Sequence, residues 1–326
     1  MVSVLLYDLV VAFLCLSLLA LVVILVIVYT KKKQVVFEPT RPSARVYPLS
    51  DLDAATHGFN HRCVLGRGRF GTVYAGVLPD GTAVALKRIH PHLVLSNAGS
   101  SFSSSIMSLS SASHPHVVSV LGYAEAPGER IVVMELAGLK SLEFHLRDQS
   151  NSATRPILDW SRRLRIAAGA ARGIEHLHEG PASSIVHGCI KPSNILIDLN
   201  WDGRVGDYGL SFLAPPEWRG LVGYLDKEYW MEKGGLCKAS DVYAFGVVLL
   251  ELLSGRSCNE GLIVEWALPL IKESKVVEIL DPRLGMPHDV KPLVRLAKVA
   301  SACVSNTRKH RPSISQVSTI LNSLKL

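Results

Sequence analysis

Three glycines between residues 66 and 71 constrain the fold of this chain more than any other feature. Gly66, Gly68 and Gly71 stand at GxGxxG spacing, which lets the backbone approach a polyphosphate without an intervening side chain. β-forming residues follow, then a turn sequence at 79–81 and a second β-forming run that ends at Lys87. Because a dinucleotide-binding loop would open a helix, we predict here a glycine-rich loop followed by a β-hairpin.

An uncharged, strongly apolar run extends from Leu9 to Tyr29. At about 1.5 Å per residue it spans a bilayer core of about 30 Å, so we predict a transmembrane helix over 9–29. Three lysines at 31–33 follow, whereas the leading stub, 1–8, carries only Asp8; this bias places the bulk of the chain in the cytoplasm. The alternatives are a cleaved signal peptide, although no clear cleavage site is evident, and a lysine triplet that also contacts anionic headgroups.

Composition excludes several classes of protein. The 326 residues are 48% hydrophobic and show no fixed-period repeat, so a full-sized core is expected and solenoids are not. Six cysteines without a CxxC pair favour reduced thiols over a disulfide frame or a zinc site. The net charge of +7 is spread along the chain, and we therefore expect no nucleic-acid partner. Prolines keep the segment 30–59 extended, so we predict a linker there and a folded domain over 60–324.

The second half of the chain carries a helix followed by two polar motifs. Apolar residues at helical spacing predict a buried helix from Asp159 to His178. After it, the run 185–196, IVHGCIKPSNIL, resembles the catalytic loop of protein kinases, and Asp207-Tyr208-Gly209 resembles their metal-binding turn. Together with the glycine loop and Lys87, these motifs make the resemblance specific.

The resemblance extends from about residue 47 to the C-terminus. Its finer detail, in the runs 47–59 and 222–229, is similar to plant receptor-like Ser/Thr kinases. It implies an α+β bilobal fold, with a small lobe of antiparallel β-sheet over about 60–136 and a helical large lobe over about 137–324. It also implies that the cleft between the lobes holds ATP and Mg²⁺.

The resemblance assigns roles to particular residues. Those expected to contact the nucleotide are Leu65, Gly66, Gly68, Gly71, Val73, Ala85, Lys87, Met134, Glu135, Ala137, Leu196 and Asp207. Asn194 and Asp207 are the expected Mg²⁺ ligands, and both offer the hard oxygen donors that this ion prefers. Position 189 with Lys191 and Asn194 forms the expected catalytic set.

Position 189 departs from the family pattern. The family has an aspartate there that accepts the proton of the substrate hydroxyl, and this chain has Cys189. Loss of a positioned base costs about 10²–10⁴ in rate, and an ordinary thiol is mostly neutral near pH 7. We interpret Cys189 as a small residue that fills the space of the carboxylate, since no base that would make it a nucleophile is evident. Gly188 likewise stands where many relatives have arginine.

Further departures lie elsewhere in the chain. The match to the family puts Ser105 where a glutamate pairs with the lysine, inside a serine-rich run that predicts a mobile or short helix. Leu221 replaces a threonine of the activation segment. We still expect Glu228 to pair with Arg311. An apolar spine is also expected from Leu109, His187 and Tyr208.

Two functions remain open at this point. One is a pseudokinase, a single-pass protein of the plasma membrane whose cytoplasmic kinase-like domain binds ATP and signals through partners. The other is a weakly active Ser/Thr kinase that relies on Lys191, Mg²⁺ and positioning. The expected partners are other membrane receptor-like kinases or cytosolic signalling proteins, together with the lipid bilayer.

Overall fold

The computed structural model describes most of the chain after residue 43. The described ranges are 44–96, 101–137, 140–147, 157–180, 184–213, 223–231, 235–258 and 262–324. The chain divides into two units, 1–42 and 43–326, and all described residues belong to the second. Within these ranges no helix has both the length and the apolar character needed to cross a bilayer. The predicted stub 1–8 and transmembrane helix 9–29 lie outside the described residues.

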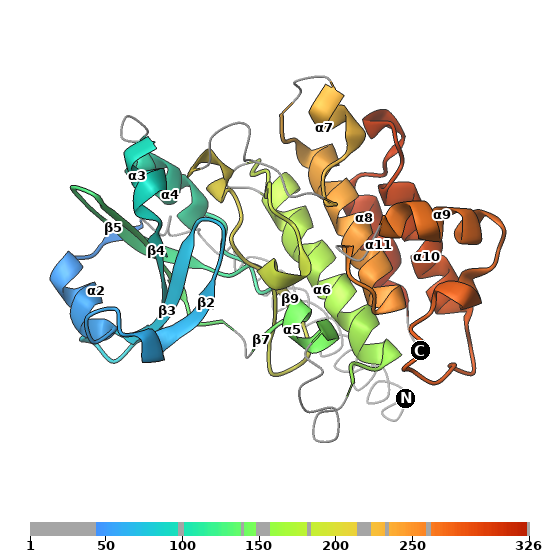
Figure 1. The fold of residues 1–326 in the computed structure, drawn as a ribbon, viewed down its shortest axis with the longest axis horizontal. Helices are drawn as coiled ribbons and strands as arrows, with labels where there is room; N and C mark the ends of the chain where they lie inside the picture. The colour runs from blue at the N-terminus through green and yellow to red at the C-terminus, as the bar shows by residue number, and fades with distance from the viewer. Residues whose placement is uncertain are drawn as a thin grey trace, which may run out of the picture. The chain divides into compact units, whose positions relative to one another are not determined.

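The second unit has two lobes (Figure 1). The strands are β1 (Arg45–Val46), β2 (Val64–Arg67), β3 (Gly71–Val77), β4 (Ala83–Ile89), β5 (Val120–Ala126), β6 (Glu129–Glu135), β7 (Lys140–Ser141), β8 (Ile195–Ile197) and β9 (Gly203–Val205). The α-helices are α2 (Leu49–Ala55), α3 (Pro91–Ser96), α4 (Phe102–Ser110), α5 (Leu142–Arg147), α6 (Trp160–Glu179), α7 (Lys227–Met231), α8 (Lys238–Ser254), α9 (Ile263–Lys272), α10 (Lys291–Cys303) and α11 (Ile314–Asn322). Short 3₁₀ helices cover His61–Cys63, Pro192–Asn194, Leu210–Leu213, Val276–Ile279 and Arg308–His310.

The small lobe is built on one sheet with strand order β1-β5-β6-β4-β3-β2. Its pairs are antiparallel, as predicted, except that β1 runs parallel to β5. Side chains alternate between the two faces of a strand, so Val84 and Leu86 of β4 enter one core while Ala85 and Lys87 face the other side. The sequence-predicted hairpin is therefore confirmed, and its register carries Lys87 to the cleft face.

The segment that precedes the predicted domain boundary is part of the folded lobe. We assigned 30–59 to an extended linker, but from residue 44 the chain adds β1 and α2 to the sheet. Leu52 of α2 is fully buried in the core that also holds Val84 and Leu86. Pro48 is the N-cap residue of α2, outside the helix, where its missing amide proton interrupts no helical hydrogen bond. The boundary at residue 60 is therefore too late.

A close approach of the backbone secures this added segment. Arg45 pairs with Gly122, and Val46 with Tyr123, in the β1–β5 ladder. A Cβ on Gly122 would lie 2.7 Å from the Tyr47 ring and would also collide with the Arg45 backbone. Only glycine lets the lead-in lie this near the sheet.

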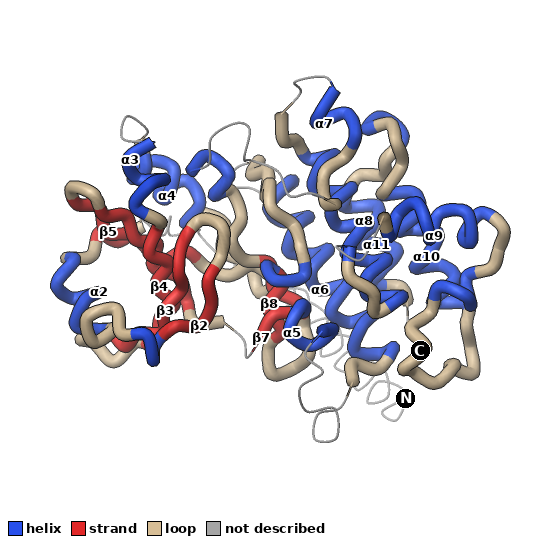
Figure 2. Tube along the Cα trace, in the orientation of Figure 1, coloured by secondary structure: helices blue, strands red, loops and turns tan. Residues whose placement is uncertain are grey.

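The large lobe is organised around α6 and α8 (Figure 1). The predicted helix from Asp159 to His178 is confirmed as α6, with the Asp159 side chain accepting a hydrogen bond from the Arg162 amide at 2.8 Å as an N-cap. α8 is buried nearly all round, as expected of a helix that is apolar on every face. Figure 2 shows the second, short sheet beside α5, between the strand-rich lobe and the helical one. Its order is β7-β8-β9.

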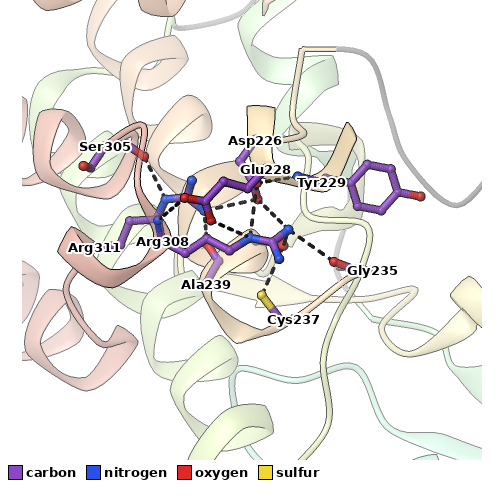
Figure 3. Close-up of polar contacts among 10 residues, drawn as sticks. Asp226, Glu228, Tyr229, Gly235, Cys237, Ala239, Ser305, Arg308 and Arg311 are labelled. Carbon is purple, nitrogen blue, oxygen red and sulfur yellow. Dashed lines mark hydrogen bonds and ion pairs between the residues drawn. The ribbon is translucent and has the colours of Figure 1, made fainter. Parts of the chain in front are cut away.

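A buried ionic cluster fixes the residues around α7 (Figure 3). Asp226 is fully buried and accepts from Arg311 at 3.1 Å and from Arg308 at 3.2 Å. Burial alone raises the pKa of the Asp226 carboxyl, but the charges of these arginines hold it below its ordinary value. Glu228 lies 3.5 Å from the Arg308 Nε atom. The prediction that Glu228 pairs with Arg311 is thus wrong, because the buried Asp226 occupies Arg311.

We predict that Leu52→Ala lowers the free energy of unfolding by about 2–5 kcal/mol, since a fully buried leucine is replaced by a cavity. Val46→Ala, in the same lead-in but 63% exposed, should change it by less than about 0.5 kcal/mol. Urea unfolding of both variants measures the difference. If Leu52→Ala lowered the free energy of unfolding no more than Val46→Ala does, the lead-in would not belong to the cooperatively folding unit.

Candidate functional site

A cavity of about 450 Å³ lies between the two lobes. Of the residues predicted from sequence to form the site, those that line it are Leu65, Gly66, Gly68, Val73, Ala85, Lys87, Met134, Glu135, Ala137, Cys189, Lys191, Asn194, Leu196 and Asp207. Gly71 is not among them; it pairs with Ile89 in the β3–β4 ladder. The fold therefore brings together residues that are more than 100 positions apart in the chain.

Lys87 and Asp207, which both line this cavity, form an ion pair. The lysine is almost fully buried, whereas about a quarter of the Asp207 side chain is exposed. Asp207 has a φ of 60°, a left-handed conformation that aspartate tolerates better than most residues. The pair was not predicted, since the family resemblance assigns these two side chains to phosphate and to metal.

The end of β6 forms part of the cavity wall. Met134 is buried and pairs with Ala85 across the β4–β6 ladder. The Glu135 carboxylate accepts from the Ser119 amide at 2.6 Å and from the Arg204 guanidinium at 2.5 Å. These bonds tie the connection between the lobes to β9.

The loop at 187–189 is held by a carboxylate from α8. Asp241 accepts hydrogen bonds from the backbone amides of His187 at 2.7 Å and Gly188 at 2.8 Å, and His178 contacts it at 2.8 Å. Asp241 is 2% exposed, and a buried carboxylate with three polar partners is stabilised where an unpaired one would not be. The loop is thus fixed through its main chain.

Cys189 lies on the floor of the cavity and is 7% exposed. Burial raises the pKa of its thiol, and the charges of Lys191, Lys87 and Arg69 oppose that effect only in part. The His187 Nδ1 atom faces the Cys189 backbone amide at 3.3 Å. In the described part of the cavity wall the carboxylates are Glu135, Glu143 and Asp207, and none forms a hydrogen bond with the thiol.

Gly188 has a φ of 73°, a conformation that costs most other residues about 1–2 kcal/mol. A Cβ there would also lie 3.1 Å from the Leu236 side chain and 3.1 Å from the Ser211 hydroxyl. Other side chains therefore already occupy the position that the Cβ of an arginine at residue 188 would take.

Helix α4 supplies no acidic side chain to Lys87. It is nine residues long, as its serine-rich sequence predicted, and Ser105 is half-buried within it. Phe102 anchors the helix against Tyr123, with ring centroids 5.9 Å apart. Tyr208 donates to the Leu109 carbonyl oxygen at 3.3 Å, and its ring lies 6.4 Å from that of His187. These contacts bring the residues of the predicted spine together.

Comparison with known proteins identifies the family to which this two-lobed fold belongs. Residues 59–321 match the family model described as protein tyrosine and serine/threonine kinase. The chain belongs to the protein kinase family.

Leu221, which stands where the family has a threonine in the activation segment, lies outside the described residues.

Relatives place the chain near plant receptor-like kinases. The proline-rich receptor-like protein kinase PERK15 of Arabidopsis thaliana is 36% identical over 83% of this chain and 56% of its own length. The receptor-like protein kinase ANXUR2 of the same plant is 37% identical over 84% of this chain and 33% of its own length. The chain thus spans about half or less of these relatives.

A solved structure shows the same fold. The pseudokinase domain of BIR2, described as an immune regulator of the RLK/Pelle family, superposes with a TM-score of 0.70 at 31% identity. The match covers 85% of each chain. The bilobal fold expected from the sequence is thereby confirmed.

Kinases of this family generally use ATP and Mg²⁺. The oxygen donors in this cleft fit a magnesium ion bound beside ATP. Asn194 is buried and donates its amide nitrogen to the Cys189 carbonyl oxygen at 2.8 Å, which leaves its amide oxygen as an acceptor. Asp207 adds a carboxylate on the same cavity. Oxygen donors of this kind suit Mg²⁺.

Several residues of the cavity were not found from sequence. They are Arg67, Arg69, Phe70, Val118, Leu136, Lys140, Ser141, Glu143, Phe144, Ser193 and Gly206. The signal for Arg69 was present, because it lies inside the glycine motif. Lys140 and Glu143 carry no local motif, and only the turn of the chain into β7 and α5 brings them to the cavity. Asp241, which holds the loop at 187–189, was not predicted from sequence either.

We predict that Cys189 reacts with iodoacetamide more slowly than the half-buried Cys63 and Cys237. Because burial raises its pKa, a smaller share of the thiol is ionised at a given pH. Its labelling should therefore increase steeply only above the ordinary thiol range, about pH 8.5. Mass spectrometry of the three peptides across pH measures this, and labelling of Cys189 at the rate of Cys63 near neutral pH is the contrary result.

Proposed function

We propose that this protein is a nucleotide-binding pseudokinase of the receptor-like type, anchored in a membrane by residues 9–29. Residues 1–8 would lie outside the cell, and the kinase-like domain, from about residue 44 to residue 324, would lie in the cytoplasm. Its output would be a conformation or a scaffold presented to other membrane receptor-like kinases or cytosolic signalling proteins. The curated relatives, as receptor-like kinases, support the plasma membrane as its location.

The single observation that carries this proposal is the environment of Cys189. A catalytic base must accept a proton near neutral pH, and this thiol is buried with its pKa raised. No described carboxylate of the cavity forms a hydrogen bond with it. Protonated thiol therefore stands where the family has an ionised carboxylate.

The pairing of Lys87 supports the same proposal. The lysine is buried against Asp207, and α4, which lacks acidic residues throughout, offers it no second partner. Loss of the helix carboxylate removes a contact that holds the family's lysine ready for the phosphates. Two independent losses compound, because phosphoryl transfer depends on alignment and charge together.

Nucleotide binding is proposed on the remaining residues. Lys87, the backbone at 66–68 and the groups at the end of β6 line one cavity with Asn194 and Asp207. ATP would place its base near Glu135 and Ala137 and its phosphates near Lys87. Mg²⁺, held by Asn194 and Asp207, would supply charge neutralisation for the phosphates.

A weakly active Ser/Thr kinase is the second candidate. It is favoured by Lys191 and Asn194, which remain in the cavity with Asp207. Positioning and electrostatics alone leave measurable rates in some enzymes that lack a catalytic group.

We predict that the full-length chain in mild detergent shows no autophosphorylation above a Lys87→Ala control. Cys189→Asp should raise the rate, by about 10²-fold, the low end for a general base, because Ser105 still leaves Lys87 without its helix partner. Cys189→Ala is the matched control and should behave as the unaltered chain does. The assay follows transfer of labelled γ-phosphate to protein.

Activity of the unaltered chain above the Lys87→Ala control would favour the weakly active kinase. If Cys189→Ala reduced that activity to the level of the Lys87→Ala control, the thiol would take part in the reaction.

A further inference from the structure

The aromatic residue of the glycine loop turns inward. The backbone at 66–68 is exposed, whereas Phe70 is only 3% exposed and belongs to the larger hydrophobic core. Its side chain also lines the cavity between the lobes. The loop therefore places a benzyl ring inside the cleft.

This ring covers Lys87. The Lys87 Nζ atom lies 6.0 Å from the centroid of the Phe70 ring, within the range of a cation–π contact. Together with Asp207, the ring leaves the lysine side chain 2% exposed. A phosphate oxygen must come within about 2.9 Å of an ammonium nitrogen to bond with it. A side chain this enclosed has no room for such an oxygen, so Phe70 or Asp207 must move before a phosphate reaches Lys87.

The turn that carries Asp207 is fixed by backbone hydrogen bonds on both sides. The Gly206 amide donates to the Asn194 carbonyl oxygen at 2.9 Å, and the Gly209 amide donates to the His187 carbonyl oxygen at 3.0 Å. Displacing this turn would break bonds to the loop that also carries Asn194.

The tip of the glycine loop, 68–70, is held less firmly. It connects β2 to β3, and Gly68 is exposed. The His90 amide donates to the Phe70 carbonyl oxygen at 3.0 Å, and the His90 Nε2 atom contacts the Gly68 carbonyl oxygen at 3.0 Å. The second contact is exposed to solvent, where water replaces a lost hydrogen bond at little cost. The ring is therefore the part of the cover over Lys87 that moves more easily.

From these contacts we infer that Phe70 is an autoinhibitory lid, closed over Lys87 and held by His90, which a nucleotide must displace before its phosphates reach the lysine. This inference rests on the proposed nucleotide binding and concerns its regulation. Burial of the ring from water favours the closed position. The apparent dissociation constant of the nucleotide then rises in inverse proportion to the fraction of molecules that are open.

The opposite role for the ring predicts an effect of the opposite sign. If Phe70 instead packed against bound phosphates and held them in the cleft, its removal would weaken nucleotide binding. A lid that competes with the nucleotide makes binding tighter when it is removed.

The test is the dissociation constant of Mg-ATP for the full-length chain in mild detergent, measured by titration calorimetry. Phe70→Ala should tighten binding by about tenfold, which corresponds to about 1.4 kcal/mol. His90→Ala keeps the ring but loses one contact of the tip, and should tighten binding by about threefold.

Phe144→Ala is the matched control, since it removes the same ring from the part of the cavity wall that α5 forms. It should not tighten binding. His90→Ala also keeps the test decisive if the loss of a buried ring at position 70 prevents folding.

Weaker or unchanged binding in both Phe70→Ala and His90→Ala would overturn the lid and leave nucleotide binding by the proposed pseudokinase intact. Failure of the unaltered chain and of every variant to bind would overturn both. Binding that appears only in Phe70→Ala would support the lid and overturn nucleotide binding by the unaltered chain.

Discussion

The carboxylate of Asp241 is the point on which the geometry of the cleft depends. It reaches from the buried helix α8 to the backbone amides of His187 and Gly188, and to His178 at the end of α6. Because the loop is held through its main chain, the side chain at position 189 does not determine where the loop lies. The fold can therefore lose a catalytic carboxylate and still keep Lys191 and Asn194 on the same cavity.

The second constraint is the charge balance of the small lobe. Lys87 is carried into the cleft by the register of β4 and is almost fully buried. A buried ammonium group needs a partner, and with Ser105 on α4 that partner is Asp207. The pair holds the 207–209 turn close to the sheet, while Tyr208 reaches the Leu109 carbonyl oxygen on α4. The turn thus connects both lobes without an acidic residue on the helix.

Much of this organisation could be predicted from the sequence because it is encoded locally. The glycine spacing and the β-forming runs fixed the hairpin that delivers Lys87, and apolar periodicity fixed α6. The lead-in at 44–59 was misjudged, because Pro48 and a short amphipathic run do not reveal that Leu52 fits the sheet core. Nearness to Gly122, more than 60 positions away, decides that packing.

Pairings between distant side chains were the least predictable part. Asp226 and Glu228 are two residues apart, and the family resemblance pointed to Glu228 as the partner of Arg311. Burial decides it, since Asp226 is fully enclosed. In the same way, the role of Asp241 depends on the packing of α8 under the loop, which no local motif reports.

The central claim is that the cleft holds nucleotide but does not transfer its phosphate. Phosphorus NMR of ATP mixed with an equal amount of the full-length chain tests both halves in one sample. We predict shifted and broadened phosphate resonances that stay those of ATP over hours. Conversion of bound ATP to ADP with a growing phosphoprotein signal, absent in Lys87→Ala, would contradict the account.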